Sequence, residues 1–423
     1  MRRFFKRLRG LFDTPAGISL GRMGTQSLSL ITAPIIAQAI GPSGRGWTAA
    51  SIAAITITGV VIGLGVPLAV RRRAVIETDR ASLVRTARLF AWFTAIPSIA
   101  LALLLATTLL HGLDLAAHIA FLVAMTTSAL TVSWVIDTQV FVADRRYFRI
   151  LWLGSIQTVT YFSVVLVLWL ADSMSIAGVI WAYASGTVAA FLLGRWWNRQ
   201  GRGKVKEFGS LFREGLKLWG SQAAEIASAR LDQLLVLPII GAAPAGLYSV
   251  AATIGALPVS IGLGLGTSAF RGFVEDRSKD LVEGAIRMAF AVALTLAVIV
   301  GVAGIWGIPW LFGEDFSGAV PLTFITLAGG VAVVGSYICS MALTARERGL
   351  TMTGVQVAGL VVGIALLIPA GNAWGAMGAA VASTIGYVAT LGGSLLALRV
   401  RPWHAVPRPA DFARGFRTFL GRA

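Results

Sequence analysis

IRMAFAVALTLAVIVGVAGIWGIPWLF, residues 286–312, decides the fold class, because its single charged side chain, Arg287, stands at the start of a long apolar run. A helix rises 1.5 Å per residue, so about 20 apolar residues cross the roughly 30 Å hydrocarbon core of a bilayer. The stretch is longer than that minimum. It therefore predicts a transmembrane helix.

Comparable stretches recur along the whole chain of 423 residues, of which 56% are hydrophobic and only 13% are charged. Soluble domains have about a quarter charged residues, so the bilayer is the expected solvent. Hydrocarbon offers backbone groups no hydrogen-bond partner, which favours helices. The sequence predicts an all-α integral membrane protein of about 12 transmembrane helices. These cover 17–40, 48–70, 89–110, 118–142, 150–171, 176–197, 218–240, 247–270, 286–312, 318–344, 350–370 and 374–398.

Basic residues are confined to a few segments between these spans. Of the 36 Lys and Arg residues, 33 lie in the N-terminal arm and in 71–88, 145–149, 195–217, 271–287, 346–348 and 399–422. Twelve crossings place all seven segments on one side of the membrane. The other side then holds Arg45 and acids such as Asp114 and Glu314. Cytoplasmic loops are enriched in Lys and Arg, so both termini are predicted to be cytoplasmic, and the charge of +17 indicates topology rather than a nucleic acid partner.

The sequence also contains a repeat of about 200 residues. A shift of 200 places Gly41 and Gly46 on Gly241 and Gly246, and it also aligns Gly178, Ala182 and Gly186 with Gly378, Ala382 and Gly386. Each half then holds six spans. Because six is an even number, the halves have the same orientation, which predicts two pseudo-symmetric six-helix lobes with a cavity between them.

The predicted domain organisation follows from the spans and the charges. A basic cytoplasmic arm (1–16) precedes an N-terminal lobe (17–198), a cytoplasmic linker (199–213), a C-terminal lobe (214–400) and a basic cytoplasmic tail (401–423). The tail combines arginines with phenylalanines. It is predicted either to lie on anionic membrane lipid as an amphipathic segment or to be disordered.

Two helices at corresponding places in the repeat carry a polar stripe. At 100° per residue, the members of each stripe share an arc of about 120°. The stripe of the first helix is Ser19, Arg22, Thr25, Gln26 and Ser29, and that of the seventh is Ser221, Gln222, Glu225, Ser228 and Asp232. Polar groups inside the membrane usually face a bundle interior or a wet cavity, so these stripes predict the substrate passage.

The depth of each charged residue separates the candidates. Arg22 lies about 9 Å from the cytoplasmic end of its helix and could snorkel to the interface, whereas Arg230 lies about 18 Å deep, where snorkelling is hard. Arg230 projects away from Glu225, so its partner is expected on another helix. Glu225 and Asp232 either carry a proton or cation or neutralise a neighbouring arginine. Asp137 is an ion-coupling candidate that a local cap or interfacial salt bridge would explain equally well.

The sequence lacks the motifs of several chemistries. It contains no GxxxxGK[ST] phosphate loop, no HExxH motif and no paired cysteines, and the single cysteine, Cys339, lies inside a span. We therefore expect no cofactor, no metal site and no enzymatic activity.

Four motifs carry a resemblance to a known family. They are IAQAIGPSGRGWTAASIAAI (36–55), LFREGLKLWGSQAAEIASARLDQLLVLPIIGAAPAGLYSVAATI (211–254), LFGEDFSGAVPLTFITLAGG (311–330) and GNAWGAMGAAVAST (371–384). In this order and spacing the chain resembles the Wzx-like polysaccharide-lipid flippases of the multidrug/oligosaccharidyl-lipid/polysaccharide exporter superfamily, which also contains the MATE transporters.

The resemblance implies a function. Such a flippase, in the bacterial cytoplasmic (inner) membrane, would move a polyprenyl-diphosphate-linked oligosaccharide between leaflets by alternating access. Its partners would be the lipid-linked glycan, membrane lipids and possible polymerase or glycosyltransferase complexes. By position, Arg22 and Arg230, with Gln26 and Gln222, match the diphosphate-binding cavity, because guanidinium groups bind phosphate bidentately. The alternatives are a cation-coupled multidrug antiporter of the same superfamily and a lipid II flippase.

Overall fold

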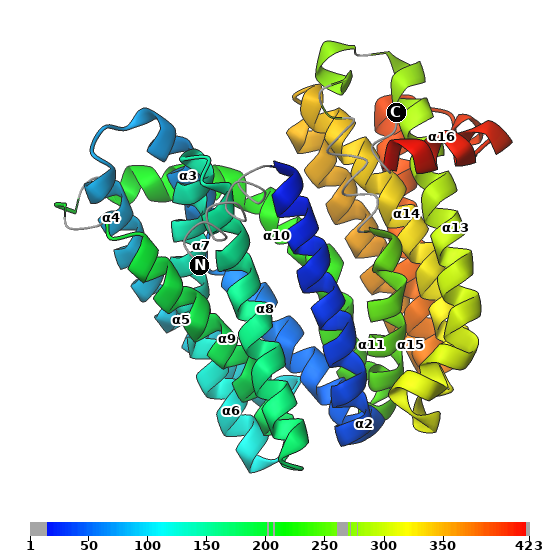
Figure 1. Cartoon of the computed structure of the whole chain (residues 1–423), viewed down its shortest axis with the longest axis horizontal. Helices are drawn as coiled ribbons and strands as arrows, with labels where there is room; N and C mark the ends of the chain where they lie inside the picture. The colour runs from blue at the N-terminus through cyan, green and yellow to red at the C-terminus, as the bar shows by residue number, and fades with distance from the viewer. Residues whose placement is uncertain are drawn as a thin grey trace, which may run out of the picture. The chain divides into compact units, whose positions relative to one another are not determined.

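The structure is a computed structural model that describes residues 15–200, 203–205, 208–259, 270, 272–276 and 278–419. The side chains of 15–23, 26, 221 and 415–419 lie outside this description. The described residues form helices and no strand (Figure 1). The helices are α2 (Pro15–Val61), α3 (Val66–Ile76), α4 (Arg80–Phe93), α5 (Ala95–Thr108), α6 (Leu115–Thr126), α7 (Ser128–Ala143), α8 (Tyr147–Leu170), α9 (Ile176–Trp197), α10 (Phe208–Ile240), α11 (Ala242–Gly255), α13 (Lys279–Phe312), η1 (Glu314–Phe316), α14 (Ala319–Ala345), α15 (Gly349–Leu398), η2 (Pro402–Ala405) and α16 (Pro409–Phe419).

The predicted spans fall on these helices, except that residues 260–269 of the predicted span 247–270 lie outside the described residues. The long helix α15 contains two predicted spans, and α2 contains one predicted span and the first part of the next, 48–70, which continues in α3; helical geometry breaks at Gly375 in α15 and at Gly41 in α2. Within the described residues, eight helices are long and apolar enough to cross a membrane, or nine if the bent pair Ser27–Val61 and Val66–Ile76 is one span. The polar helix α10 is not among them. Helix α15, which contains two predicted spans, is counted as one helix. These two features account for much of the difference from twelve.

The chain divides into two compact units, which we call unit 1 (Met1–Ile226) and unit 2 (Ala227–Ala423). The division falls inside α10, whereas the sequence places a linker at 199–213. The first part of α10 belongs to unit 1 because it packs on the turn between α2 and α3. There Trp219 Nε1 donates to the Val61 carbonyl at 3.0 Å, and Gly65 and Gly215 lie so close that a side-chain carbon on either would meet the other segment's backbone.

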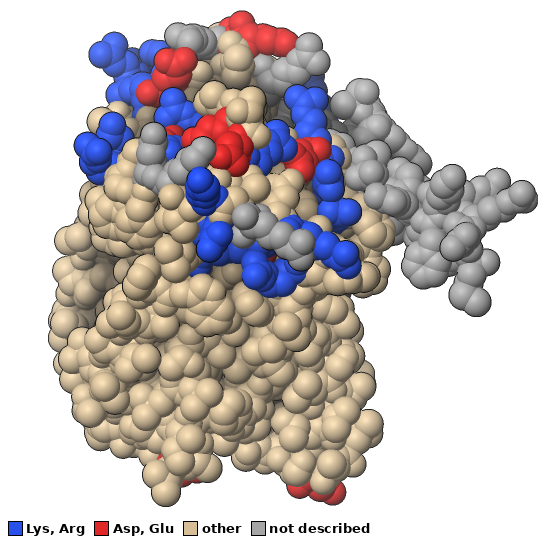
Figure 2. Space-filling model, turned by 90° about the vertical axis from the view of Figure 1, so that its left-hand side faces the viewer, with Lys and Arg blue, Asp and Glu red and all other residues tan. Residues whose placement is uncertain are grey.

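In unit 1, α2 packs against α8, which in turn packs on α9, and α3 and α4 pack against α7. The basic segments of this unit meet at one end. Arg73 pairs with Glu214 at 2.7 Å, Arg80 pairs with Asp144 at 2.5 Å, and Arg85 donates to the Gly203 carbonyl at 2.7 Å. On the face shown in Figure 2, Lys and Arg side chains gather at one end, above a broad belt that is free of charged residues.

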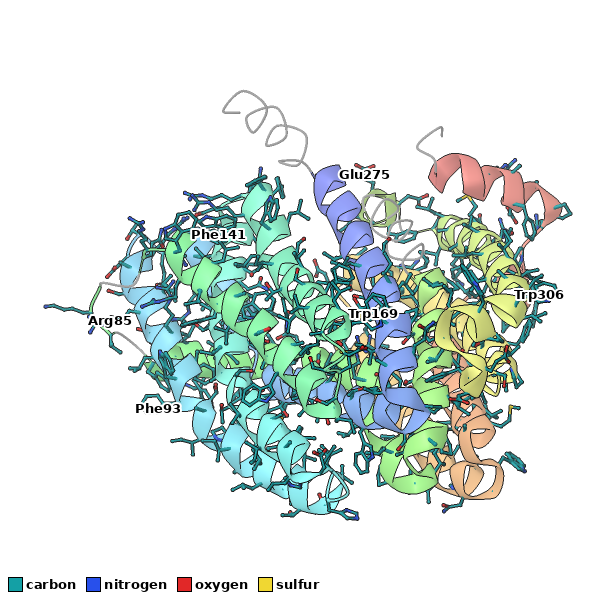
Figure 3. The ribbon with its side chains drawn as sticks, turned by 60° about the horizontal axis from the view of Figure 1, so that its bottom comes forward. Arg85, Phe93, Phe141, Trp169, Glu275 and Trp306 are labelled. Atoms are coloured by element: carbon teal, nitrogen blue, oxygen red, sulfur yellow. The ribbon has the colours of Figure 1, made fainter. Side chains whose placement is uncertain are left out.

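In unit 2, α14 packs against α11, α13 and α15. Its basic segments also meet at one end. Arg348 donates to the Ala397 carbonyl at 2.6 Å, and Arg287 of α13 pairs with Asp411 of α16 at 3.2 Å. The tail contains two short helices, η2 and α16, and the second reaches Phe419. Large apolar side chains such as Phe93 in unit 1 and Trp306 in unit 2 are 56% and 70% exposed (Figure 3), as expected of surfaces in contact with lipid.

The repeat has a direct structural counterpart in Gly41 and Gly241. Gly41 has φ 67° and ψ −179°, and Gly241 has φ 87° and ψ 169°. This region of backbone conformation is accessible essentially only to glycine. Both residues end one helical stretch and start the next, and the glycines five positions later, Gly46 and Gly246, are buried. The two turns, 200 residues apart, therefore have the same backbone conformation.

We expect Gly41→Ala and Gly241→Ala to lower the free energy of unfolding by about 1–3 kcal/mol each, because the new methyl group strains the backbone. An added Cβ meets nothing within 4 Å at either site, so the cost is conformational. Thermal unfolding of the purified protein would measure it. Gly154→Ala, at an open position inside α8, is the control and should cost nothing. Equal melting temperatures of all three variants would contradict the assignment.

Candidate functional site

A hydrogen-bonded cluster surrounds Asp232 in unit 2. The Tyr248 hydroxyl donates to Asp232 Oδ2 at 2.5 Å, and the Tyr387 hydroxyl donates to the same oxygen at 3.4 Å. The Gln233 backbone N–H donates to Oδ1 at 2.7 Å. Tyr248 also shares a 2.9 Å hydrogen bond with the Ser383 hydroxyl. We call Asp232, Tyr248, Ser383 and Tyr387 the Asp232 cluster.

Three helical segments place these side chains together. Asp232 lies on α10, and the glycine turn at Gly241 reverses the chain so that Tyr248 of α11 returns beside it. Ser383 and Tyr387 lie four residues apart on the second half of α15, so they project from one face. The two halves of α15 pack closely because Gly386 lies against Gly359, where an added Cβ on Gly386 would stand 3.0 Å from the Gly359 carbonyl oxygen.

A small cavity of about 40 Å³ adjoins the cluster. Its lining includes Ser228, Asp232, Gly363, Tyr387 and Thr390. The Ser228 hydroxyl is buried and has no hydrogen-bond partner among the described residues. A site for one water needs about 10–15 Å³ and two or more polar partners. The cavity can therefore hold a few waters or a small cation, and it is far too small for a sugar.

Asp232 forms no salt bridge among the described residues, although the positive charge of Arg230, two residues earlier on α10, acts on it electrostatically. Its hydrogen-bond partners there are hydroxyl and N–H donors. Carboxylates inside membrane segments are costly and mark proton relays and ion pathways. The arrangement can accept a proton or bind a cation beside the neutral hydroxyls.

The other predicted residues on α10 are separate from this cluster. Arg230 is exposed, and its Nη1 donates to Gln233 Oε1 at 3.3 Å. The expectation that its partner lies on another helix is wrong, because Gln233 follows one turn later on the same helix. Gln222 is half-buried and Glu225 is exposed, and both belong to the part of α10 assigned to unit 1.

The candidates on the first helix cannot be placed in the same detail. The backbone of Arg22 and Gln26 lies in α2, but both side chains lie outside the described residues. Their predicted role in binding a diphosphate stays a prediction. The same holds for the cavity that the sequence predicts between the two lobes.

Asp137 lies in a different environment, in the interior of unit 1. Its side chain is fully buried, and Oδ1 accepts from Arg88 Nη2 at 2.7 Å and from Asn198 Nδ2 at 2.8 Å. Arg88 also donates to the Asn198 carbonyl at 2.7 Å. The pair ties α4 to α7 and to the end of α9. This is the salt-bridge explanation of Asp137, and a role in ion coupling stays a prediction.

A family model described as "Polysaccharide biosynthesis protein" matches residues 16–270, which is more than half of the chain. The chain belongs to this polysaccharide biosynthesis family. No curated protein sequence matches it.

Solved structures share the fold of this polysaccharide biosynthesis family member. It is similar to "Lipid II flippase MurJ, inward closed conformation", with a TM-score of 0.77 at 14% identity over 95% of this chain and 90% of the other. An inward-facing multidrug resistance MATE family transporter of the MOP superfamily matches with a TM-score of 0.68 at 14% identity, over 96% of this chain and 98% of the other. A MOP superfamily transporter from Pyrococcus furiosus matches with a TM-score of 0.61 at 12% identity, over 99% and 96%.

These findings confirm two predictions. The chain is a multi-pass membrane protein with the all-α fold found in the MOP superfamily, and it belongs to the polysaccharide biosynthesis family. At 12–14% identity the solved structures establish the fold alone.

Three members of the Asp232 cluster could not be singled out from the sequence. Tyr248, Ser383 and Tyr387 lie in alanine- and glycine-rich helices where no charge drew attention to them. The chain has only 6 tyrosines, and two of them contact one aspartate, so a tyrosine inside a predicted span was the available signal. Arg88 lies in the basic segment 71–88 of the sequence, but its side chain is only 7% exposed and points into unit 1.

We expect Arg88→Ala to destabilise the protein by about 3–5 kcal/mol, because it leaves the Asp137 carboxylate buried without its partner. Arg72→Ala is the control. That side chain is 71% exposed and pairs with Glu214 at 3.2 Å, so its loss should cost less than about 1 kcal/mol. Heat-induced aggregation of the two purified variants measures the difference. Equal loss of stability would show that Arg88 and Asp137 do not tie the helices together.

Proposed function

We propose that the protein is a flippase that moves a polyprenyl-diphosphate-linked oligosaccharide across the cytoplasmic membrane by alternating access, for surface polysaccharide biosynthesis. The observation that carries the proposal is the match of residues 16–270 to a polysaccharide biosynthesis family. The fold, which is similar to that of solved transporters, agrees with it. The basic ends of both units would face the cytoplasm, because cytoplasmic loops are rich in Lys and Arg. A polymerase or glycosyltransferase complex is the proposed partner on the biosynthetic route.

The proposed role of each predicted residue follows from the chemistry of its side chain. Arg22 and Arg230, assisted by Gln26 and Gln222, would hold the diphosphate, because guanidinium groups form paired charge-assisted hydrogen bonds with phosphate oxygens. The exposure of Arg230 and its weak 3.3 Å bond to Gln233 leave most of its donors available to a substrate. No catalytic group is needed, because flipping breaks no covalent bond.

The Asp232 cluster would couple this movement to an ion. A cation or proton at Asp232 would occupy the small cavity between α10 and α15, next to the buried Ser228 hydroxyl. Loading or emptying the cavity would change the charge between these helices, which biases one conformation over another. Glu225 is the second candidate for this role.

Loss of the gene should trap lipid-linked glycan in the cytoplasmic leaflet, and Arg230→Ala should do the same at normal protein levels. We expect export to fall roughly tenfold or more, since a hydrogen bond to a charged group contributes about 1.5–3 kcal/mol. Glycan export in cells and the accumulated lipid-linked glycan are the measurements. Arg213→Ala, an exposed arginine on the same helix, is the matched control and should export normally. Unchanged export of every surface glycan in the deletion strain would overturn the proposal in favour of the multidrug antiporter.

Asp232→Asn should abolish the dependence of export on the coupling ion while the protein remains folded. Asparagine has nearly the same shape and can still accept the Tyr248 hydrogen bond, but it carries no charge. Transport by the purified protein in vesicles, with a proton or a sodium gradient, measures the coupling. Glu225→Gln is the comparison that separates the two acids. Retained ion dependence in Asp232→Asn, with loss in Glu225→Gln, would assign coupling to Glu225 instead.

A further inference from the structure

A basic pocket lies at the end of unit 1 where the basic segments meet. It has a volume of about 310 Å³, in the range of ligand-binding pockets. Its lining comes from the turn between α7 and α8 and from the end of α9, and includes Phe141, Asp144, Arg146, Arg149, Trp197 and Arg199. We call it the α8–α9 pocket. Phe141, at the end of α7, is labelled in Figure 3.

The charge of the α8–α9 pocket is positive. Arg146, Arg149 and Arg199 contribute three guanidinium groups, against the single carboxylate of Asp144. That carboxylate is already engaged by Arg80 at 2.5 Å and by Arg146 at 3.5 Å. Arg199 is exposed, and no ion pair of Arg199 is found among the described residues. The pocket therefore favours an anion.

Aromatic rings hold one guanidinium in position. The Arg149 guanidinium carbon lies 5.3 Å from the Phe141 ring centroid and 5.9 Å from that of Trp197, and Nη1 donates to the Trp197 carbonyl at 3.2 Å. These contacts preorganise Arg149, so less side-chain entropy is lost when a ligand binds. Arg146 is also the residue before α8, and no acidic residue lies in the first turn of that helix.

The surroundings of the pocket indicate where the anion comes from. Trp152 and Trp196, close in sequence to the pocket residues, are 43% and 62% exposed, and tryptophan is enriched where hydrocarbon meets headgroups. Basic pockets between membrane helices on the cytoplasmic side bind lipid headgroups. We propose that the α8–α9 pocket binds the phosphate of an anionic phospholipid of the adjoining leaflet. This inference does not depend on what the protein transports.

The test uses the purified full-length protein and short-chain phosphatidylglycerol as the probe, with binding measured by native mass spectrometry. We expect the double variant Arg146→Gln with Arg199→Gln to bind this lipid roughly 30-fold more weakly, since each arginine near a headgroup contributes about fivefold. Arg71→Gln with Lys204→Gln removes two exposed charges from the same end of unit 1 and should bind like the wild type. Both double variants should keep the wild-type melting temperature without added lipid.

Two further ligands separate the sources of the phosphate. Short-chain phosphatidylcholine has the same phosphate but no net charge, and it should bind much more weakly than phosphatidylglycerol. Inorganic phosphate should bind weakly, since it lacks the acyl chains. Equal binding of the two lipids, or unchanged binding by the pocket variant, would overturn the proposal. Inorganic phosphate binding as tightly as phosphatidylglycerol would identify a site for soluble anions and would also overturn it.

Discussion

The structure depends on the absence of hydrogen-bond partners in lipid, which forces each membrane segment to satisfy its own backbone. The described residues satisfy their backbone groups by forming helices. Hydroxyl side chains inside these helices also form hydrogen bonds within their own helix. Thr32 and Thr323, for example, donate to the carbonyls four residues earlier, at 2.7 Å and 2.8 Å. Where the chain must turn abruptly, glycine supplies the conformation, as at Gly41 and Gly241. The 200-residue repeat is therefore visible in backbone geometry even where the side chains of the two halves differ.

The buried aspartates of the two units, Asp137 and Asp232, differ in how their charge is compensated. Asp137 is neutralised by Arg88 and accepts a further hydrogen bond from Asn198, and the three side chains together connect the helices of unit 1. Asp232 receives hydrogen bonds from two tyrosines and one backbone N–H, with no ion pair among the described residues and with a small cavity beside it. An ion pair stabilises one packing arrangement of the helices. A carboxylate beside a cavity can instead bind and release a proton or a cation. This contrast makes Asp232 the stronger candidate for ion coupling.

The polysaccharide biosynthesis family match and the shared fold agree with such a site, because a flippase needs conformational change rather than bond chemistry. The cavity beside Asp232 has room for a few waters or a small ion, so substrate and coupling ion would occupy different places. The α8–α9 pocket adds a third place for charge, at the basic end of unit 1. Two of its arginines, Arg146 and Arg199, are exposed and so contribute to the basic end rather than to the helix interior.

The sequence by itself determined the membrane class, the positions of the spans, the clustering of basic residues and the glycine repeat. Each of these follows from local composition and periodicity, which the bilayer constrains directly. The polar stripe of α10 also identified Asp232. Tertiary structure alone decided its partners, since Tyr248 and Ser383 lie 135 residues apart and meet only when α11 packs on α15. It likewise decided that Arg88 turns inward to Asp137 rather than outward to water, because a pairing across 49 residues depends on how helices pack and leaves no periodic signal in the chain.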